Sequence, residues 1–180
     1  MGKILLPEGA APATPASGYL AIYATTGGAA AFINDGGTTG TFASHTAFAS
    51  WTPTLQFGGA AVGMTFTTQV GTYVRVGNLV FVNFFLLLSA KGSSTGTCTV
   101  GGLPFAAAAA TNHIFAWPLI GYSLSTITAG NQLYCSVVAG ASALSLRNHA
   151  PTAALASLTD ANFGATSTIH ATGVYITSGY

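Results

Sequence analysis

The spacing of apolar and polar residues along the chain predicts an all-β fold. Residues 64–67 alternate apolar with polar side chains, which is typical of a strand buried on one face. Residues 73–76 and 79–82 are β-rich runs separated by Gly77 and Asn78, the clearest hairpin signal in the sequence. No stretch shows a sustained helical period bounded by capping residues. We therefore expect sheets and no long helix.

The second strand of this hairpin continues without alternation to residue 88, interrupted only by Asn83. A strand that is apolar on both faces is typically buried on both faces, so we expect a second layer to cover its outer side. Further strands are expected at residues 96–100, 114–124, 132–138, 142–147 and 168–177. About eight strands at this spacing predict a sandwich, and the count favours a jelly roll.

The first residues of the chain form a different pattern. Prolines interrupt residues 1–16, which predicts an extended arm, and the apolar residues near the start suit an arm laid on a partner surface. The residues expected to anchor it are Ile4, Leu5, Leu6, Pro7, Pro12 and Pro15. We therefore divide the chain into an arm (1–16), a hairpin module with a linker (17–50) and a jelly-roll-like β domain (51–180).

The hairpin module pairs residues 19–23 with residues 30–33. An isolated hairpin of this length is not stable alone in water, so we expect it to pair with copies of itself around an axis. Together with the doubly apolar strand, it predicts a homotrimer whose interface includes Tyr19, Ile22, Tyr23, Phe32, Phe84 and Phe85.

Charge is scarce enough to exclude several classes of protein. The 180 residues include four Lys and Arg and three Asp and Glu, for a net charge of +1, and half of the chain is hydrophobic. An ordinary soluble domain is about 25% charged. A surface with so little charge is poorly hydrated and repels its own copies weakly. We therefore expect much of the surface to be covered by other protein.

The distribution of charge and apolar residues also bears on partners. Lys3, Arg75, Lys91 and Arg147 are far apart in the sequence, whereas nucleic-acid binding needs clustered cations. The longest apolar run, residues 79–88, is about half of what a membrane-spanning helix requires. We expect neither a nucleic-acid partner nor membrane insertion.

The sequence offers few groups for catalysis or metal binding. Glu8 lies in the arm, and Asp35 and Asp160 lie in turn-like segments, so no pair of carboxylates is predicted. The histidines and cysteines have no metal-ligand spacing, and no nucleophile elbow or phosphate-binding loop is present. The residues concerned are His45, His113, His149, His170, Cys98 and Cys135. We expect a protein that is not an enzyme, with buried thiols, no cofactor and no metal.

Two alternatives to this interpretation, each with a binding site, stay open. Three copies of His170 on a three-fold axis would be able to bind a metal or an anion, although a hydrogen-bonded interface histidine is the simpler interpretation. Trp51, Trp117 and Tyr122 are candidate glycan contacts, although tryptophan and tyrosine are also the usual anchors of cores and protein interfaces.

Several segments resemble virion proteins of tailed bacteriophages. Residues 15–24, closing on residues 32–38, look like a module common in such proteins. Residues 51–59, 71–78, 91–96 and 101–105 resemble domains of phage tail fibres or exterior structural proteins. The resemblance covers about residues 15–105, and the last third of the chain matches only in style. It implies a homotrimeric protein on the exterior of a virion, with jelly-roll-like domains, and carries over no receptor-binding residue.

The chain departs from a long tail fibre because it has no heptad shaft, no large adhesin region and only a short arm. These departures favour a capsid decoration protein whose arm binds the major capsid protein. The alternative is a short tail-fibre or tail-tip protein, held by a tail protein, that binds host-surface glycans. A third, more distant hypothesis is a bacterial lectin-like module.

Overall fold

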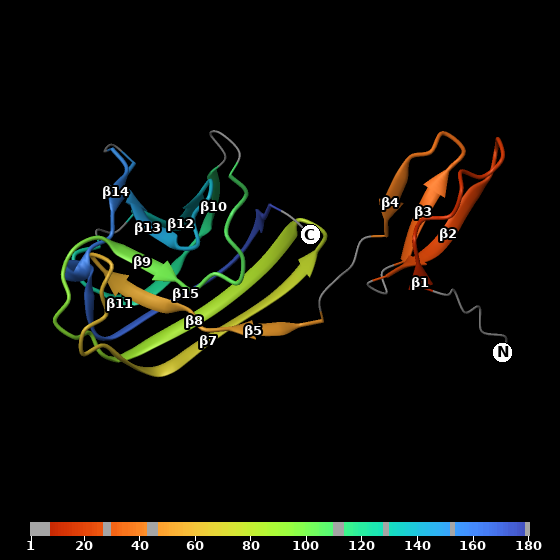
Figure 1. Ribbon diagram of the computed structural model, residues 1–180. Coiled ribbons are helices and arrows are strands. Elements are labelled where there is room, and N and C mark those ends of the chain that lie inside the picture. The colour runs from red at the N-terminus through yellow and green to blue at the C-terminus, as the bar shows by residue number, and fades with distance from the viewer. Residues whose placement is uncertain are drawn as a thin grey trace. The chain divides into compact units, whose positions relative to one another are not determined.

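The protein is built almost entirely from β-strands. A computed structural model describes residues 8–26, 30–42, 47–109, 114–127, 130–151 and 154–178. Apart from one 3₁₀ turn, Asp160–Asn162, every described element is a strand, which confirms the all-β prediction. The chain divides into two compact units, Met1–His45 and Thr46–Tyr180, which are described separately (Figure 1).

The first unit is a small four-stranded sheet. Its strands follow one another in the order of the chain, β1 (Glu8–Gly9), β2 (Leu20–Thr25), β3 (Ala30–Asn34) and β4 (Thr39–Thr41). The predicted hairpin is formed by β2 and β3, with Ile22 opposite Phe32. The ring of Phe32 lies against Gly40 of β4, where an added Cβ would stand 2.6 Å from the ring. A glycine is therefore required for β4 to pair beside this aromatic residue.

The proposed arm is partly joined to this sheet. Strand β1 pairs with β2 in parallel, with Glu8 opposite Ala24. Pro12 and Pro15 lie in the segment between β1 and β2, which has no regular structure. The other anchoring residues, Ile4, Leu5, Leu6 and Pro7, lie outside the described residues.

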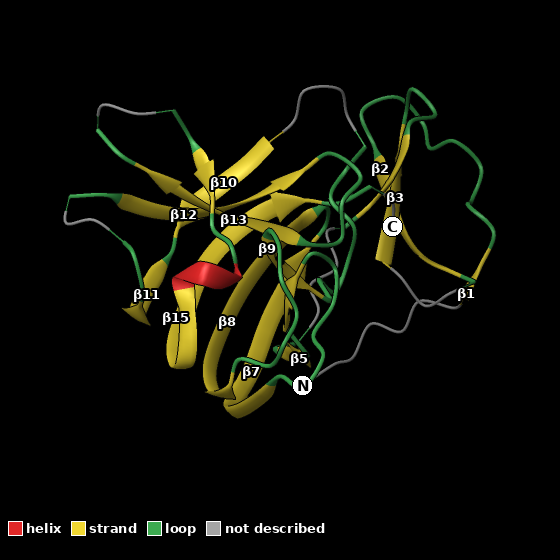
Figure 2. Ribbon diagram, turned by 90° about the vertical axis from the view of Figure 1, so that its left-hand side faces the viewer, coloured by secondary structure: helices red, strands yellow, loops and turns green. Residues whose placement is uncertain are grey.

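The second unit is a sandwich of two sheets (Figures 1 and 2). The six-stranded sheet has the order β10-β12-β13-β9-β6, with β14 pairing β13, and the five-stranded sheet has the order β11-β15-β8-β7-β5. The strand bounds are β5 (Ala49–Trp51), β6 (Thr54–Phe57), β7 (Thr65–Val76), β8 (Leu79–Ala90), β9 (Cys98–Gly101), β10 (Ile114–Pro118), β11 (Ile120–Leu124), β12 (Gln132–Val138), β13 (Leu144–His149), β14 (Ala156–Ser157) and β15 (Phe163–Ile176).

The clearest hairpin signal of the sequence corresponds to the β7–β8 hairpin of the sandwich. The turn between β7 and β8 is at Gly77 and Asn78, with Val76 opposite Leu79. The chain differs from prediction at residues 114–124, which form two strands in different sheets. The Leu119 N–H still donates to the Leu133 carbonyl oxygen of β12 at 3.0 Å, and the chain then crosses to the five-stranded sheet, where Ile120 begins β11.

The boundary between the units also differs from the sequence-based division at residue 50. Ala49 and Ser50 belong to β5, which pairs with Tyr73 and Thr72 of β7. They are therefore part of the sandwich rather than of the hairpin module.

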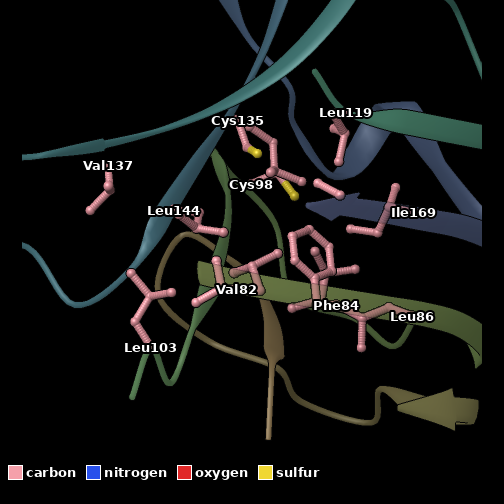
Figure 3. Packing of buried hydrophobic residues seen from close by; sticks show 14 of the residues in the cluster. Val82, Phe84, Leu86, Cys98, Leu103, Leu119, Cys135, Val137, Leu144 and Ile169 are labelled. Carbon is pink, nitrogen blue, oxygen red and sulfur yellow. The ribbon is translucent and has the colours of Figure 1, made fainter. Parts of the chain in front are cut away.

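The core lies between the two sheets. Alternate residues of β8, from Val80 to Leu88, point into it and are buried (Figure 3). The intervening residues Leu79, Phe81 and Phe85 are exposed. Within the single chain a sandwich strand has a facing layer on one side only, so the expected cover of the outer face would have to come from another molecule and stays a prediction.

The two cysteines are buried in this core as free thiols, as predicted. They lie on strands β9 and β12, which flank β13 on opposite sides. Two strand spacings are about 9–10 Å, beyond the reach of a disulfide. Burial raises the pKa of Cys135 to about 12 and that of Cys98 well above its usual value, so both thiols stay protonated and unreactive.

Candidate functional site

The outer side of the five-stranded sheet is rich in apolar side chains, and we call this surface the apolar face. Residues opposite each other on antiparallel strands point to the same side, so pairing defines rows across the sheet. One row runs through Val74, Phe81 and Val174, and a second through Val70, Phe85 and His170. The apolar face consists of Val70, Val74, Val76, Leu79, Phe81, Phe85, Ile120, Tyr122, His170, Val174 and Ile176.

These side chains are unusually open to solvent for residues of their type. Phe81 is 46% exposed, Val70 48% and Tyr122 59%. Scattered exposed apolar residues are common on proteins, but a contiguous apolar patch marks an interaction surface.

No described charged side chain breaks this surface. Arg75 is on β7 but occupies an inward position opposite Val80. Its Nε donates to the carbonyl oxygen of Gly77 at 2.7 Å, and its guanidinium carbon lies 4.7 Å from the centroid of the Phe105 ring. The cation is therefore held at the rim of the core, and the apolar face stays uncharged over the part of the chain that the structure describes.

Three rings form a stack on this face. His170 of β15 lies between Phe85 of β8 and Tyr122 of β11, with centroid distances of 5.6 and 6.0 Å and interplanar angles of 28° and 21°. Strand pairing places His170 directly opposite Phe85 on one side. On the other side His170 is opposite Ile120, and Tyr122 is two residues further along the same strand. Among the described residues, no group of three His, Cys, Asp or Glu is placed to hold a metal. The three-copy metal hypothesis for His170 stays a prediction.

A polar row divides the apolar face into two bands. It contains Thr72, Asn83 and Thr172, and the Asn83 Nδ2 atom donates to Thr172 Oγ1 at 2.7 Å. A hollow of about 120 Å³ lies beside this row, and Phe48, just before β5, is among the residues that line it. This polar row marks one position along the strands, which a purely aliphatic surface would not do.

Three residues that were predicted to contact a partner or a glycan are buried in the structure. Phe84 is fully buried between the sheets, so it packs within its own chain rather than at a trimer interface. Trp51 and Trp117 are 8% and 7% exposed, so neither ring is open to a glycan. Each instead lies against a glycine of the five-stranded sheet, Trp51 on Gly71 and Trp117 on Gly173. Tyr122, the third candidate glycan contact, is exposed.

The predicted interface residues of the small sheet do reach its surface. Tyr19 and Ile22 are exposed, and Tyr23 and Phe32 are half-buried. Leu20 and Phe42 are further exposed apolar residues of this unit, which the sequence analysis did not single out. The unit therefore also presents apolar side chains for a partner.

Asp35 and Asp160 lie in turn-like segments as expected, but each side chain accepts from a backbone N–H of a distant segment rather than from its own turn. Asp35 accepts a hydrogen bond from the Gly18 N–H at 2.8 Å. Asp160 accepts one from the Gly96 N–H at 2.8 Å and lies 3.4 Å from the Lys91 Nζ atom. Of the candidate histidines, His149 is exposed on β13, whereas His45 and His113 lie outside the described residues.

Asp160 should contribute to stability at neutral pH and lose that contribution in acid. The Gly96 N–H, helped by Lys91, holds its pKa below the ordinary value. A depressed folded-state pKa stabilises the fold above the unfolded-state pKa of about 4, and the stabilisation is lost as the pH falls through the folded value. We expect Asp160→Asn to lower the urea midpoint at pH 7 and to flatten its decrease between about pH 5 and pH 3. An unchanged acid dependence would show that Asp160 contributes nothing there.

Most residues of the apolar face were not singled out from the sequence. Val70, Val74 and Val174 lie on the two strands that pair with residues 79–88, and Ile120 lies on β11, which pairs with β15. No protein-family model matches the chain, and no curated protein matches it in sequence. No helix within the described residues is long and apolar enough to cross a membrane.

Proposed function

We propose that the chain is a non-enzymatic structural protein of a phage virion, a homotrimeric capsid decoration protein that reinforces the capsid through its N-terminal arm. The observation that carries this proposal is the uncharged apolar face of the sandwich. The resemblance of residues 15–105 to tailed-phage exterior proteins supports the virion context.

The size of the apolar face suits self-association. The four strands that contribute to it, at about 4.8 Å spacing and over the length from Thr68 to Val76, give a footprint of roughly 15 by 27 Å, or about 400 Å². A stable protein interface buries about 800 Å² per partner, and the exposed residues of the small sheet add to the available area. Three copies around a three-fold axis would enclose their apolar faces in a shared core.

A second copy is a better occupant for this face than a charged partner or solvent. The face has no described charge to pair with a charged partner, and the net charge of +1 opposes self-association weakly. Aromatic and aliphatic residues at the centre of a patch are the usual anchors of an interface. The polar row of Thr72, Asn83 and Thr172 would fix the register between copies.

Copy number per virion tests the decoration role. Quantitative mass spectrometry of purified particles should find hundreds of copies of the chain. A few tens or fewer, located at the tail, would overturn decoration in favour of the alternative, a short tail-fibre or tail-tip protein. That alternative is favoured by one observation, the exposed ring of Tyr122.

Deleting residues 1–14 tests the role of the arm. The truncated protein should still form trimers, because the apolar face is intact, but should no longer attach to capsids in a co-sedimentation assay. The full-length chain is the control. Loss of the trimer would show that the arm assembles the protein, and retained attachment would show that another surface anchors it.

A further inference from the structure

The outer side of the six-stranded sheet differs from the apolar face. Leu144 and Leu146 point into the core, which places the intervening residues of β13 on the outer side. Strand pairing then puts Tyr134 beside Arg147 and Gln132 beside His149. We call this surface the polar face, and its members include Gln56, Thr99, Gln132, Tyr134, Ser145, Arg147 and His149.

A hollow of about 590 Å³ opens at one edge of the polar face. Its described lining residues are Ala116, Trp117, Pro118, Gln132, Leu133 and Tyr134, all from β10 and β12. No residue of the facing sheet is among them, so the hollow lies outside the core. Its volume is in the range of small-molecule sites, about 300–1,000 Å³.

Arg147 gives this corner a positive charge that no carboxylate neutralises among the described residues. The ion pair within that part of the chain joins Lys91 to Asp160. One terminal nitrogen of Arg147 donates to Ser157 Oγ at 3.1 Å, which orients the guanidinium. A guanidinium has five N–H donors in a planar fork, so most of them stay free for a ligand carboxylate.

We propose that this corner of the polar face binds an acidic saccharide. The Arg147 guanidinium holds the sugar carboxylate through paired hydrogen bonds, and the apolar side of a sugar ring packs on Tyr134 or Pro118. The side chains of Gln132 and His149 can each donate and accept hydrogen bonds, as the hydroxyl groups of a sugar also do. One cation at the site favours a ligand with isolated carboxylates over a nucleic acid, which needs several.

This inference does not depend on the proposed function, because it concerns the opposite side of the sandwich from the apolar face. A decoration protein and a tail protein would both leave the polar face outward when the apolar faces are enclosed. Its failure would leave the trimer and the copy number unchanged.

Binding of tri-galacturonate to the full-length protein tests the proposal. Isothermal titration calorimetry should detect binding, with at least about tenfold weaker binding to the fully methyl-esterified trisaccharide, which has the same rings without the charges. Added salt should weaken the binding of tri-galacturonate and leave the binding of the methyl ester unaffected. Absence of binding, or equal binding of acid and ester, would overturn the proposal.

Variants locate the site. Arg147→Gln should weaken tri-galacturonate binding at least about tenfold, and Tyr134→Leu, which keeps apolar bulk, should weaken it as well. Lys91→Gln removes the same charge elsewhere in the sandwich and should bind like the original protein. Unchanged binding by Arg147→Gln would overturn the assignment. Equally tight binding of a triglutamate peptide would show that the corner takes any carboxylate and would overturn its assignment to a sugar.

Discussion

Replacing Phe81 by lysine should dissociate the assembled protein into single folded chains. Phe81 lies in the middle of the apolar face, between Val74 and Val174. A lysine enclosed there would lose its hydration and would find no described carboxylate on the face to pair with. Leaving an unpaired charge in an interface costs several kcal/mol, so we expect the association constant to fall at least about 100-fold per interface.

The single chain should tolerate this change. The position is nearly half exposed, so the lysine can extend into solvent once the copies separate. Native mass spectrometry should find chains of 18.0 kDa for the variant and three-chain assemblies for the original protein. Far-ultraviolet circular dichroism should show that the variant keeps its sheets.

Gln56→Lys is the matched control, because it adds the same charge to the polar face. This variant should stay trimeric. A trimeric Phe81→Lys variant would show that the apolar face is not the interface. A dimer of the original protein would support association through the face and overturn the three-fold arrangement, and a stable monomer would overturn the assembly itself.

Gly173→Ala should strongly destabilise the sandwich. A Cβ at this position would stand 2.1 Å from the indole ring of Trp117, closer than any real contact. The ring is 7% exposed and packed in the core, so it cannot rotate away. Overpacking a core costs about 1–3 kcal/mol, and a rigid buried indole places this change at the upper end, about 3 kcal/mol. The melting temperature should fall by about 10 °C.

Gly164→Ala on the same strand is its control. A Cβ there meets nothing nearer than Ser167 Oγ at 4.0 Å, so we expect the free energy of unfolding to change by less than about 0.5 kcal/mol. Both melting temperatures are measured at one protein concentration, because the proposed assembly would contribute to stability. A stable Gly173→Ala variant would show that Trp117 can move and that the two sheets are not fixed by this contact.

Local signals were sufficient wherever neighbouring residues decide the structure. The Gly77-Asn78 turn, the β2–β3 hairpin and the strand at residues 132–138 are all as the sequence predicts. Turn chemistry and alternation act over a few residues, so they can be identified in the linear sequence.

The candidate sites could be predicted less well, because they depend on pairing between distant strands. Phe84 and Phe85 are neighbours of the same chemical type, yet one is in the core and the other on the apolar face. The strand's composition cannot distinguish them, because either set of alternate residues would make an acceptable core face. The polar face was also hidden, since Tyr134 and Arg147 meet only through the pairing of β12 with β13.

The sequence by itself determined that the chain is all-β, that its thiols are buried, and that it has very few charged residues. Composition and local periodicity are sufficient for these conclusions, because they depend on what residues are present and on their immediate neighbours. The tertiary structure alone decided which side of each strand faces the core. In the tertiary structure Trp51 and Trp117 are buried, and the outer sides of the two sheets form one apolar and one polar face. Burial depends on the layer packed opposite each strand, and that layer comes from residues far away in the chain.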